Sequence, residues 1–234
     1  IVGSENCVGL VMSKISVSLE APGSVRRGAD SGKTTGHVVF RAGEHHGKIS
    51  TRTQALASMM GCIDEAVATD NLWGERWSKL SHNSMGNPVS AISGLGSSGY
   101  MQIPSARKLS IWLACESAKV GLALGYDIPK FGGVDATTWA SASNESTFED
   151  LDEMLAKTAG SNSDWRASMS QDVSKGRRSE IEFMNGHVVN KGLETGIPTP
   201  VSESVVSVMH KIDIGAIDPA TPNIDMALHL ANLQ

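Results

Sequence analysis

Hydrophobic residues in the first fifty positions occur in short runs separated by turn-forming residues. Val8–Met12 and His37–Phe40 are apolar or rich in β-branched side chains, and Pro22-Gly23 and Asp30–Gly32 lie between them. Short runs bounded by proline and glycine are typical of strands joined by tight loops. We therefore expect residues 1–50 to form a short β segment.

From Thr51 onward the apolar positions recur at helical spacing. The first set is Ala55, Met59, Cys62, Ile63 and Ala66, and the second is Leu109, Leu113, Val120 and Leu124. Steps of three, four and seven residues place side chains on one face of a helix. Gly125 is placed to end the second helix as a C-terminal cap.

Later segments alternate between loop and helix patterns. The stretch 132–146 is rich in glycine, serine and asparagine and predicts an exposed loop, whereas Thr147–Glu153 is typical of a helix start because acidic residues favour the helix N-terminus. Helices are expected at about 179–195 and about 201–210. The proline-interrupted tail 213–234 is expected to be partly ordered.

These patterns predict a mainly α protein, with a β segment at 1–50 and a helical domain at 51–234. The 234 residues are 40% hydrophobic and 19% charged, which is ordinary for a globular chain. A net charge of -5 gives no general attraction to nucleic acid. No apolar run approaches the length of a membrane span. We expect neither a nucleic-acid nor a membrane partner.

The residues that often bind metals do not form a ligand pattern. Cys7, Cys62 and Cys115 lack metal-ligand spacing, and an odd number of unpaired cysteines favours a reducing, cytoplasmic setting. The side chains of His45-His46 should diverge on a strand or loop, and no third ligand type is evident, so a solvated pair is favoured over a metal site. We expect no metal.

Nucleotide-binding motifs are absent or incomplete. Gly28–Thr34 resembles a phosphate-binding P-loop, but three residues separate its glycines where the motif needs four, and a strand-like run follows. We interpret it as a hairpin turn. No G-x-G-x-x-G dinucleotide fingerprint occurs in the chain.

The strongest chemical signal is a stripe of polar residues. If the segment is helical, Lys79, Asn83 and Asn87 are spaced at i, i+4 and i+8 on one face, where an ammonium and two carboxamides can hold the oxygens of a small polar acid. Pro88 lacks a backbone N–H, so it should free the carbonyl of Ser84 and kink the helix. A solvated polar face is the alternative, although asparagine is a poor helix former.

A second signal lies in Ser168–Gly186. It combines a hydroxyl, a Gly176–Arg178 turn and a helix start at Ser179-Glu180. By itself the pattern predicts a helix-turn-helix with a solvated, charged turn. It names no reaction.

Taken in order, the two signals resemble the C-terminal domain of the ketopantoate reductase (2-dehydropantoate 2-reductase) family. The stripe, preceded by Trp77 and followed by Pro88, is similar to the family's Lys-Asn-Asn pattern. Ser168, followed by Gly176–Gly186 and Gly196–Pro200, resembles the family's second signature.

The front of the chain fits the same family. Ala21–Val25 and Gly43-Glu44 resemble the last strands of its nucleotide-binding domain, so the resemblance spans roughly residues 8–211 in patches. It implies a 6-phosphogluconate-dehydrogenase-C-terminal-like helical domain. Residues 1–50 would then be the short β segment left from a truncated Rossmann-type domain.

The resemblance implies a role for each matched residue. Lys79 would be the catalytic general acid that protonates the carbonyl oxygen, where negative charge develops as hydride arrives. Asn83 and Asn87 would hydrogen-bond the substrate, and Ser168 would meet its carboxylate. Glu180 would reach the ribose region of the cofactor and the catalytic lysine, whose charged form it would favour.

Two departures bear on the substrate. Ser97 stands where the family usually carries a further substrate-binding asparagine, and the segment 128–167 is longer than the usual connection. Because pocket contacts set specificity, another 2-keto acid is an alternative to 2-dehydropantoate.

The resemblance implies an NADPH-dependent oxidoreductase of pantothenate biosynthesis. Without the family's fingerprint, the chain would be a truncated, split or incomplete enzyme that binds the dinucleotide poorly and is inactive alone. The alternative is a non-catalytic helical binding or dimerisation module, and a homodimer stays open because removing the other domain would expose apolar helices.

Overall fold

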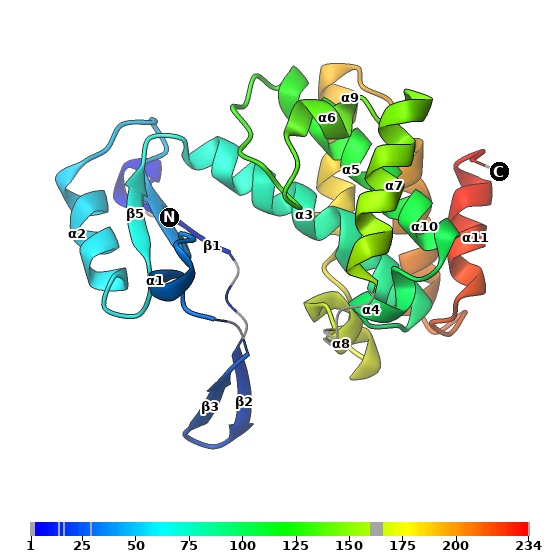
Figure 1. Ribbon diagram of the computed structural model, residues 1–234, viewed down its shortest axis with the longest axis horizontal. Coiled ribbons are helices and arrows are strands. Elements are labelled where there is room, and N and C mark those ends of the chain that lie inside the picture. The colour runs from blue at the N-terminus through cyan, green and yellow to red at the C-terminus, as the bar shows by residue number, and fades with distance from the viewer. Residues whose placement is uncertain (1–2, 14, 16, 29, 160–165, 234) are drawn as a thin grey trace. The chain divides into compact units, whose positions relative to one another are not determined.

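The chain divides into two compact units, one rich in strands and one helical. The computed structural model describes residues 3–13, 15, 17–28, 30–159 and 166–233. The units are Ile1–Lys79 and Leu80–Gln234, and Figure 1 shows the strands of the first and the helices of the second.

The first unit contains a three-stranded sheet and a separate hairpin. In chain order its elements are η1 (Ser4–Asn6), β1 (Gly9–Met12), β2 (Val17–Ala21), β3 (Ser24–Arg27), α1 (Gly32–Thr35), β4 (Phe40–Gly43), α2 (Thr51–Met60) and β5 (Ala66–Thr69). In the sheet β4 is central. It pairs antiparallel with β1, with Gly9 opposite Gly43, and parallel with β5, with Phe40 opposite Ala66. The hairpin is β2 with β3.

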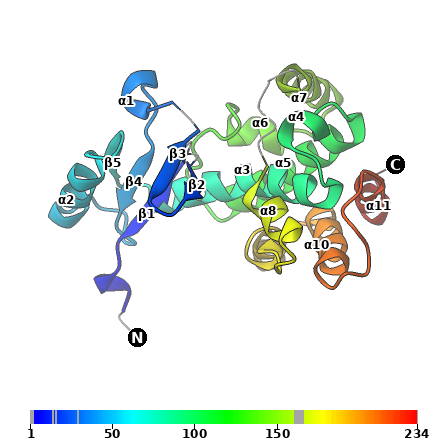
Figure 2. The ribbon, with the colours of Figure 1, turned by 90° about the horizontal axis from the view of Figure 1, so that it is seen from below.

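A β-α-β unit explains why the first unit extends past residue 50. Parallel strands need a crossover, usually a helix, and α2 contacts both β4 and β5. In Figures 1 and 2 this helix lies beside the strands of its unit. The boundary expected at residue 50 therefore differs from the division observed after Lys79.

The predicted extension of the first helix to Ala66 is wrong. The helix α2 ends at Met60, and Ala66 begins β5. Met59 and Ile63 are 68% and 59% exposed, so their apolar spacing does not mark a core-facing side. Pairing with β4 decides the structure at Ala66, because a strand is stabilised by its neighbour in the sheet.

One predicted turn is confirmed and one is wrong. Pro22-Gly23 joins β2 to β3, and Gly23 has φ 78°, a conformation that costs glycine little. The run Gly28–Thr34, in which residue 29 lies outside the described residues, is no hairpin turn. It leads into the short helix α1, whose N-cap Ser31 accepts a hydrogen bond from the Lys33 N–H at 3.2 Å.

The carboxylate of Asp64 ties this segment to the sheet. Burial by itself raises the pKa of Asp64, but hydrogen bonds from the side chain of Arg27, the backbone N–H of Glu65, the hydroxyl of Ser31 and the N–H of Lys33 outweigh it. They hold the pKa well below its usual range. The fully buried charge is thus compensated, as buried charges must be.

Glu44 joins the end of β4 to the start of α2. Arg52 donates from Nε to Oε1 at 2.7 Å and from Nη2 to Oε2 at 2.6 Å, and the hydroxyl of Ser50, the N-cap of α2, donates a third hydrogen bond. These bonds, chiefly those from Arg52, outweigh burial and lower the pKa of Glu44 from 4.5 to about 2.

The acid stability of the protein should depend on this pair. Because the folded pKa lies below the ordinary value, the Glu44 carboxylate stabilises the fold above about pH 4.5, and that stability is lost as the pH falls through about 2. We expect Arg52→Met to unfold at lower urea than the unaltered protein at pH 7, with a smaller difference near pH 2. Circular dichroism measures the transitions. The matched control is Arg26→Met, since its partner Glu20 is exposed. Equal urea midpoints at pH 7 for Arg52→Met and the unaltered protein would contradict the role.

The second unit is built around one buried helix. The remaining elements are α3 (Leu72–Ser93), which spans the division between the units, α4 (Ser97–Tyr100), α5 (Pro104–Ala123), α6 (Ala136–Ala140), α7 (Glu145–Thr158), α8 (Ser168–Ser174), η2 (Ile181–Phe183), α9 (Asn185–Thr195), α10 (Pro200–Asp213) and α11 (Pro222–Leu230). The helix α5 contacts α6, α7, α9, α10 and α11. Its residues are buried on nearly all sides, as expected for a central helix.

Most of the helix predictions in this unit are confirmed. The helices α5, α7 and α10 lie where the sequence places them, and Gly125 follows α5 with φ 79°. The tail is more ordered than expected, because α11 packs on α5 and α10. No helix among the described residues is long and apolar enough to span a bilayer.

Two predictions in this unit are corrected. The stretch 132–146 is not simply an exposed loop, since it contains α6 and the fully buried Trp139, which stacks on Phe131 and donates to its carbonyl at 3.0 Å. The helix expected over 179–195 is interrupted. Its first turn is the 3-10 helix η2, and α9 begins after Met184, whose φ of -111° and ψ of -92° are not helical.

Candidate functional site

The helix α3 carries the polar stripe. Its 22 residues are continuous, so Lys79, Asn83 and Asn87 recur one helical turn apart on one face, as the spacing predicts. Near its start, the side chain of Asn71 accepts a hydrogen bond from the Gly74 N–H at 3.1 Å. Lys79 is the last residue of the first unit, and both asparagines belong to the second.

Asn87 is the most buried residue of the stripe. It is 5% exposed, while Lys79 and Asn83 are half-buried. Within the described part of the chain, no hydrogen bond engages the Asn87 side chain. Its amide nitrogen and oxygen are not among the fully buried unpaired atoms of the described residues, so they are accessible to water or to a ligand. A binding role and a solvated polar face are both compatible with this placement.

The carbonyl freed by Pro88 finds a partner far along the chain. Pro88 lies inside α3 and cannot donate to the Ser84 carbonyl four residues before it. The Nδ2 of Asn185 donates to that carbonyl at 3.1 Å, in the buried interior. The predicted loss of the helical hydrogen bond is therefore accompanied by a replacement. Asn185 lies within the second signature, but its contact with Ser84 could not be predicted from the sequence, because the two residues are 101 positions apart.

The second signature brings two predicted residues into contact. Ser168 begins α8, and its hydroxyl donates to Oε1 of Glu180 at 3.1 Å. Both side chains are exposed, and so are available to a ligand. The connection between them turns at Gly176, which has φ 65°.

The segment that bears Glu180 is anchored on α10. Ser179 donates to Asp213 twice, from its backbone N–H at 3.0 Å and from its hydroxyl at 2.7 Å. Glu182 and His210 form a further pair at 2.6 Å. Contacts on both sides thus fix the backbone at Glu180 while leaving its carboxylate exposed.

Ser97 lies on a different element from the other predicted residues. It begins the four-residue helix α4 and is half-buried. At the other end of α4, the buried Tyr100 places its hydroxyl against Gly86, where an added Cβ would lie only 3.1 Å away. Burial raises the pKa of Tyr100 to about 12, so the phenol stays neutral. The end of α4 therefore packs against Gly86 of α3, and the role of Ser97 stays a prediction.

The β-α-β unit does not fit the pyrophosphate of a dinucleotide. In α/β folds such groups bind at a helix N-terminus after a glycine-rich turn. Here the Ser50 side chain caps α2, and the buried carboxylate of Glu44 already lies at the same end. The negative charge of Glu44 would repel a pyrophosphate bound at this helix end. Within the described residues of the unit, the helix end is thus filled by the protein's own groups.

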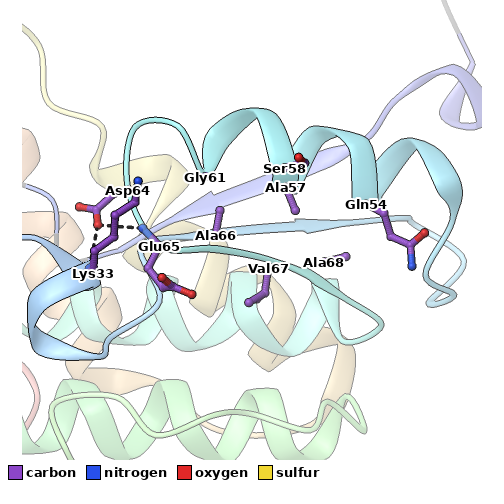
Figure 3. Close-up of a pocket in the computed structure, with 10 residues that line it drawn as sticks. All are labelled: Lys33, Gln54, Ala57, Ser58, Gly61, Asp64, Glu65, Ala66, Val67 and Ala68. Carbon is purple, nitrogen blue, oxygen red and sulfur yellow. Dashed lines mark hydrogen bonds between the residues drawn. The ribbon is translucent and has the colours of Figure 1, made fainter.

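Two clefts lie away from the predicted residues. One, of about 400 Å³, runs along α2 and β5 (Figure 3) and is lined mostly by small side chains, with Lys33, Asp64 and Glu65 at one end. The other, of about 480 Å³, is lined by residues of α5, α7 and α11. Neither includes a residue of the stripe, Ser168 or Glu180.

Comparisons with known sequences point to one family. Residues 71–213 match the family described as ketopantoate reductase PanE/ApbA C terminal. The 2-dehydropantoate 2-reductase of Archaeoglobus fulgidus is 25% identical over 190 residues, which cover 78% of this chain and 58% of that protein. The Mesorhizobium japonicum enzyme of the same name is 27% identical over 214 residues, covering 91% and 57%. The chain thus spans little more than half the length of these relatives.

Solved structures share the fold. A PanE/ApbA family ketopantoate reductase from Ralstonia eutropha aligns with TM-score 0.65 and 21% identity, covering 89% of this chain and 59% of that one. D-mandelate dehydrogenase with NADH and anilino(oxo)acetate aligns with TM-score 0.68 and 18% identity, covering 91% and 62%. A dimeric ketopantoate reductase from Staphylococcus aureus has TM-score 0.62 and 17% identity, covering 89% and 62%.

Proposed function

The chain belongs to the ketopantoate reductase family, and we propose that it supplies the substrate-binding half of an NADPH-dependent 2-keto acid reductase, with 2-dehydropantoate as the first candidate substrate. One observation carries the proposal: a single helix presents Lys79, Asn83 and Asn87 on one face, within the residues that match the family. The names of the curated relatives support the same reaction class.

Lys79 would act as the general acid. When the ketone carbon accepts hydride, the electron pair of the C=O bond moves to oxygen, and the Lys79 ammonium gives that oxygen a proton. The products are a 2-hydroxy acid and a neutral amine, which regains its proton from solvent. NADPH supplies the hydride when bound, and the described residues do not cradle its pyrophosphate.

The remaining residues would hold the keto acid. Asn87 has a carboxamide that is accessible to a substrate oxygen, and Asn83 lies one turn away on the same face. Ser168 would meet the carboxylate, and its contact with Glu180 at 3.1 Å orients the hydroxyl. We assign Glu180 to the ribose side of the cofactor, and Ser97 to the far end of the substrate.

The hydrogen-bond donors of the proposed site indicate the substrate class. An ammonium, two carboxamides and a hydroxyl suit a small acid that bears a keto group and a carboxylate. Ser97 in place of the family's usual asparagine changes one of these contacts, so a different 2-keto acid is the second candidate. The structural neighbour that binds anilino(oxo)acetate supports this breadth. By analogy with the dimeric neighbour, we propose a homodimer.

A non-catalytic helical module is the alternative function. The two functions differ in a direct test. Isothermal titration calorimetry of the chain with 2-dehydropantoate should show binding, and NADPH oxidation should follow when the chain is part of a complete reductase with a nucleotide-binding domain. Absence of both, for every 2-keto acid of a small panel, would favour the module.

A further inference from the structure

We propose that Asn185 is a positioning residue for substrate binding, which holds the turn of α3 between Asn83 and Asn87 by donating to the carbonyl that Pro88 leaves unpaired. The inference rests on the proposed function, since it concerns the same site. It assigns a role to a residue that touches no proposed ligand. All of its residues lie in the second unit.

The need for Asn185 arises from Pro88. In a regular helix the N–H at position 88 would donate to the Ser84 carbonyl, but proline has no N–H and its ring crowds that carbonyl. Ser84 and Asn185 are both fully buried, so water is a poor substitute. A buried carbonyl left unpaired is costly. Since a carbonyl can only accept, the group facing it must be the Nδ2 donor of Asn185.

Asn185 lies in a buried part of the backbone. Met184 breaks the helical path and Asn185 begins α9. The next residue, Gly186, lies against the end of the Glu182 side chain, 2.8 Å from where an added Cβ would stand. Glu182 is itself paired with His210 of α10. The carboxamide therefore reaches α3 from the buried start of α9.

The hydrogen bond joins the two segments that carry the proposed substrate ligands. On one side, Ser84 follows Asn83 directly and lies in the turn that leads to Asn87. On the other side, Asn185 lies five residues after Glu180, whose carboxylate accepts from Ser168. Losing the bond would release the α3 turn from the Ser168–Glu180 segment. Small displacements of positioning groups cost binding and rate steeply.

No second described partner backs up this bond. The Oδ1 of Asn185 and the Oγ of Ser84 are both buried without a hydrogen-bond partner among the described residues. Position 185 therefore holds the turn through a single donor. Asn185→Leu removes the donor at similar size, and Asn185→Asp replaces it with an acceptor.

The chain offers a matched control on the same helix. Asn223 is also buried, and its Nδ2 donates to the Ile92 carbonyl at 3.0 Å, near the C-terminal end of α3. Calorimetry of each variant with 2-dehydropantoate, and thermal unfolding by circular dichroism, are the measurements. We expect Asn185→Leu and Asn185→Asp to weaken keto acid binding at least tenfold. Asn223→Leu should lose comparable thermal stability while changing the affinity less than twofold.

A second background separates positioning from simple damage to the fold. Pro88→Ala restores an N–H that can donate to the Ser84 carbonyl, so Asn185 is no longer the only donor. In this background we expect Asn185→Leu to change the keto acid dissociation constant less than threefold. In the complete reductase, Asn185→Leu should raise the KM for the keto acid when Pro88 is present. It should raise that KM much less in the Pro88→Ala background, and the KM for NADPH should stay unchanged in both.

The outcomes distinguish the inference from the function on which it rests. Equal losses of affinity in the two backgrounds, or full affinity in folded Asn185→Leu, would overturn the positioning role while leaving the reductase proposal intact. If the unaltered protein binds no 2-keto acid and the complete reductase turns none over, the proposed function fails, and the inference fails with it.

Discussion

Lys79→Ala is expected to lower kcat of the complete reductase for its 2-keto acid by two or more orders of magnitude, the usual scale for the loss of a general acid. Without the ammonium, the oxygen that gains charge during hydride transfer has no nearby proton donor. Asn83 and Asn87 remain, so the KM for the keto acid should change less than kcat. Steady-state NADPH oxidation gives both constants.

Two further lysine variants make this test specific. Lys79→Arg keeps the positive charge but holds its proton too tightly to act as an acid, so it should bind the keto acid and remain slow. Lys157→Ala is the matched control, because that lysine is exposed on α7 and pairs with Glu153. Turnover close to that of the unaltered enzyme in folded Lys79→Ala would remove Lys79 from the mechanism.

Glu116→Ala should destabilise the second unit by about 3 kcal/mol. The substitution leaves two buried N–H groups without a hydrogen-bond partner, and each unpaired group costs roughly 1–3 kcal/mol. Oε1 accepts from the Val201 N–H and Oε2 from the Ser202 N–H, both at 2.7 Å. The helix α10 begins with Pro200, and its N-cap residue makes no side-chain hydrogen bond. A carboxylate from α5 therefore caps this helix, whose first N–H groups have no partner within it.

Urea unfolding of Glu116→Ala, followed by circular dichroism, measures this loss. The control is Glu203→Ala, because Glu203 is an exposed carboxylate in the first turn of the same helix. We expect that control to change stability by less than about 0.5 kcal/mol, as surface substitutions usually do. Equal stability of Glu116→Ala and Glu203→Ala would contradict the capping role.

The same carboxyl group should make stability depend on pH. Burial raises the pKa of Glu116 from 4.5 to about 7, and the hydrogen bonds from α10 offset part of this rise. Because the folded pKa lies above the ordinary value, the stabilising contribution is present below about pH 4.5 and is lost as the pH rises through about 7. Glu116→Gln cannot titrate, so its free energy of unfolding should vary less over this range. An unchanged slope would assign the pH dependence to other groups.

The arrangement of the polar stripe could be predicted from the sequence because its three residues lie on one helix. Lys79, Asn83 and Asn87 share a face as soon as the segment is helical, and Pro88 frees the Ser84 carbonyl in any helix. The mainly helical fold of the family is confirmed. These conclusions need only covalent order and helical geometry.

Patterns that depend on neighbours were less reliable. The polar stretch around Trp139 suggested a loop, yet that side chain is fully buried against Phe131. The apolar spacing from Ala55 to Ala66 suggested a single helix, yet pairing with β4 makes Ala66 the start of a strand. In both cases tertiary contacts outweigh the local pattern, which carries too little free energy to decide the structure.

The sequence by itself determined the helical stripe, the broken hydrogen bond at Pro88 and the order of the two signatures. Only the tertiary structure decided which distant side chains pair with the buried backbone groups. Asn185 meets Ser84 from 101 positions away, and Glu116 meets Val201 from 85. The physical reason is that helix geometry follows from adjacent residues, whereas the partner of a buried polar group depends on which distant elements pack beside it.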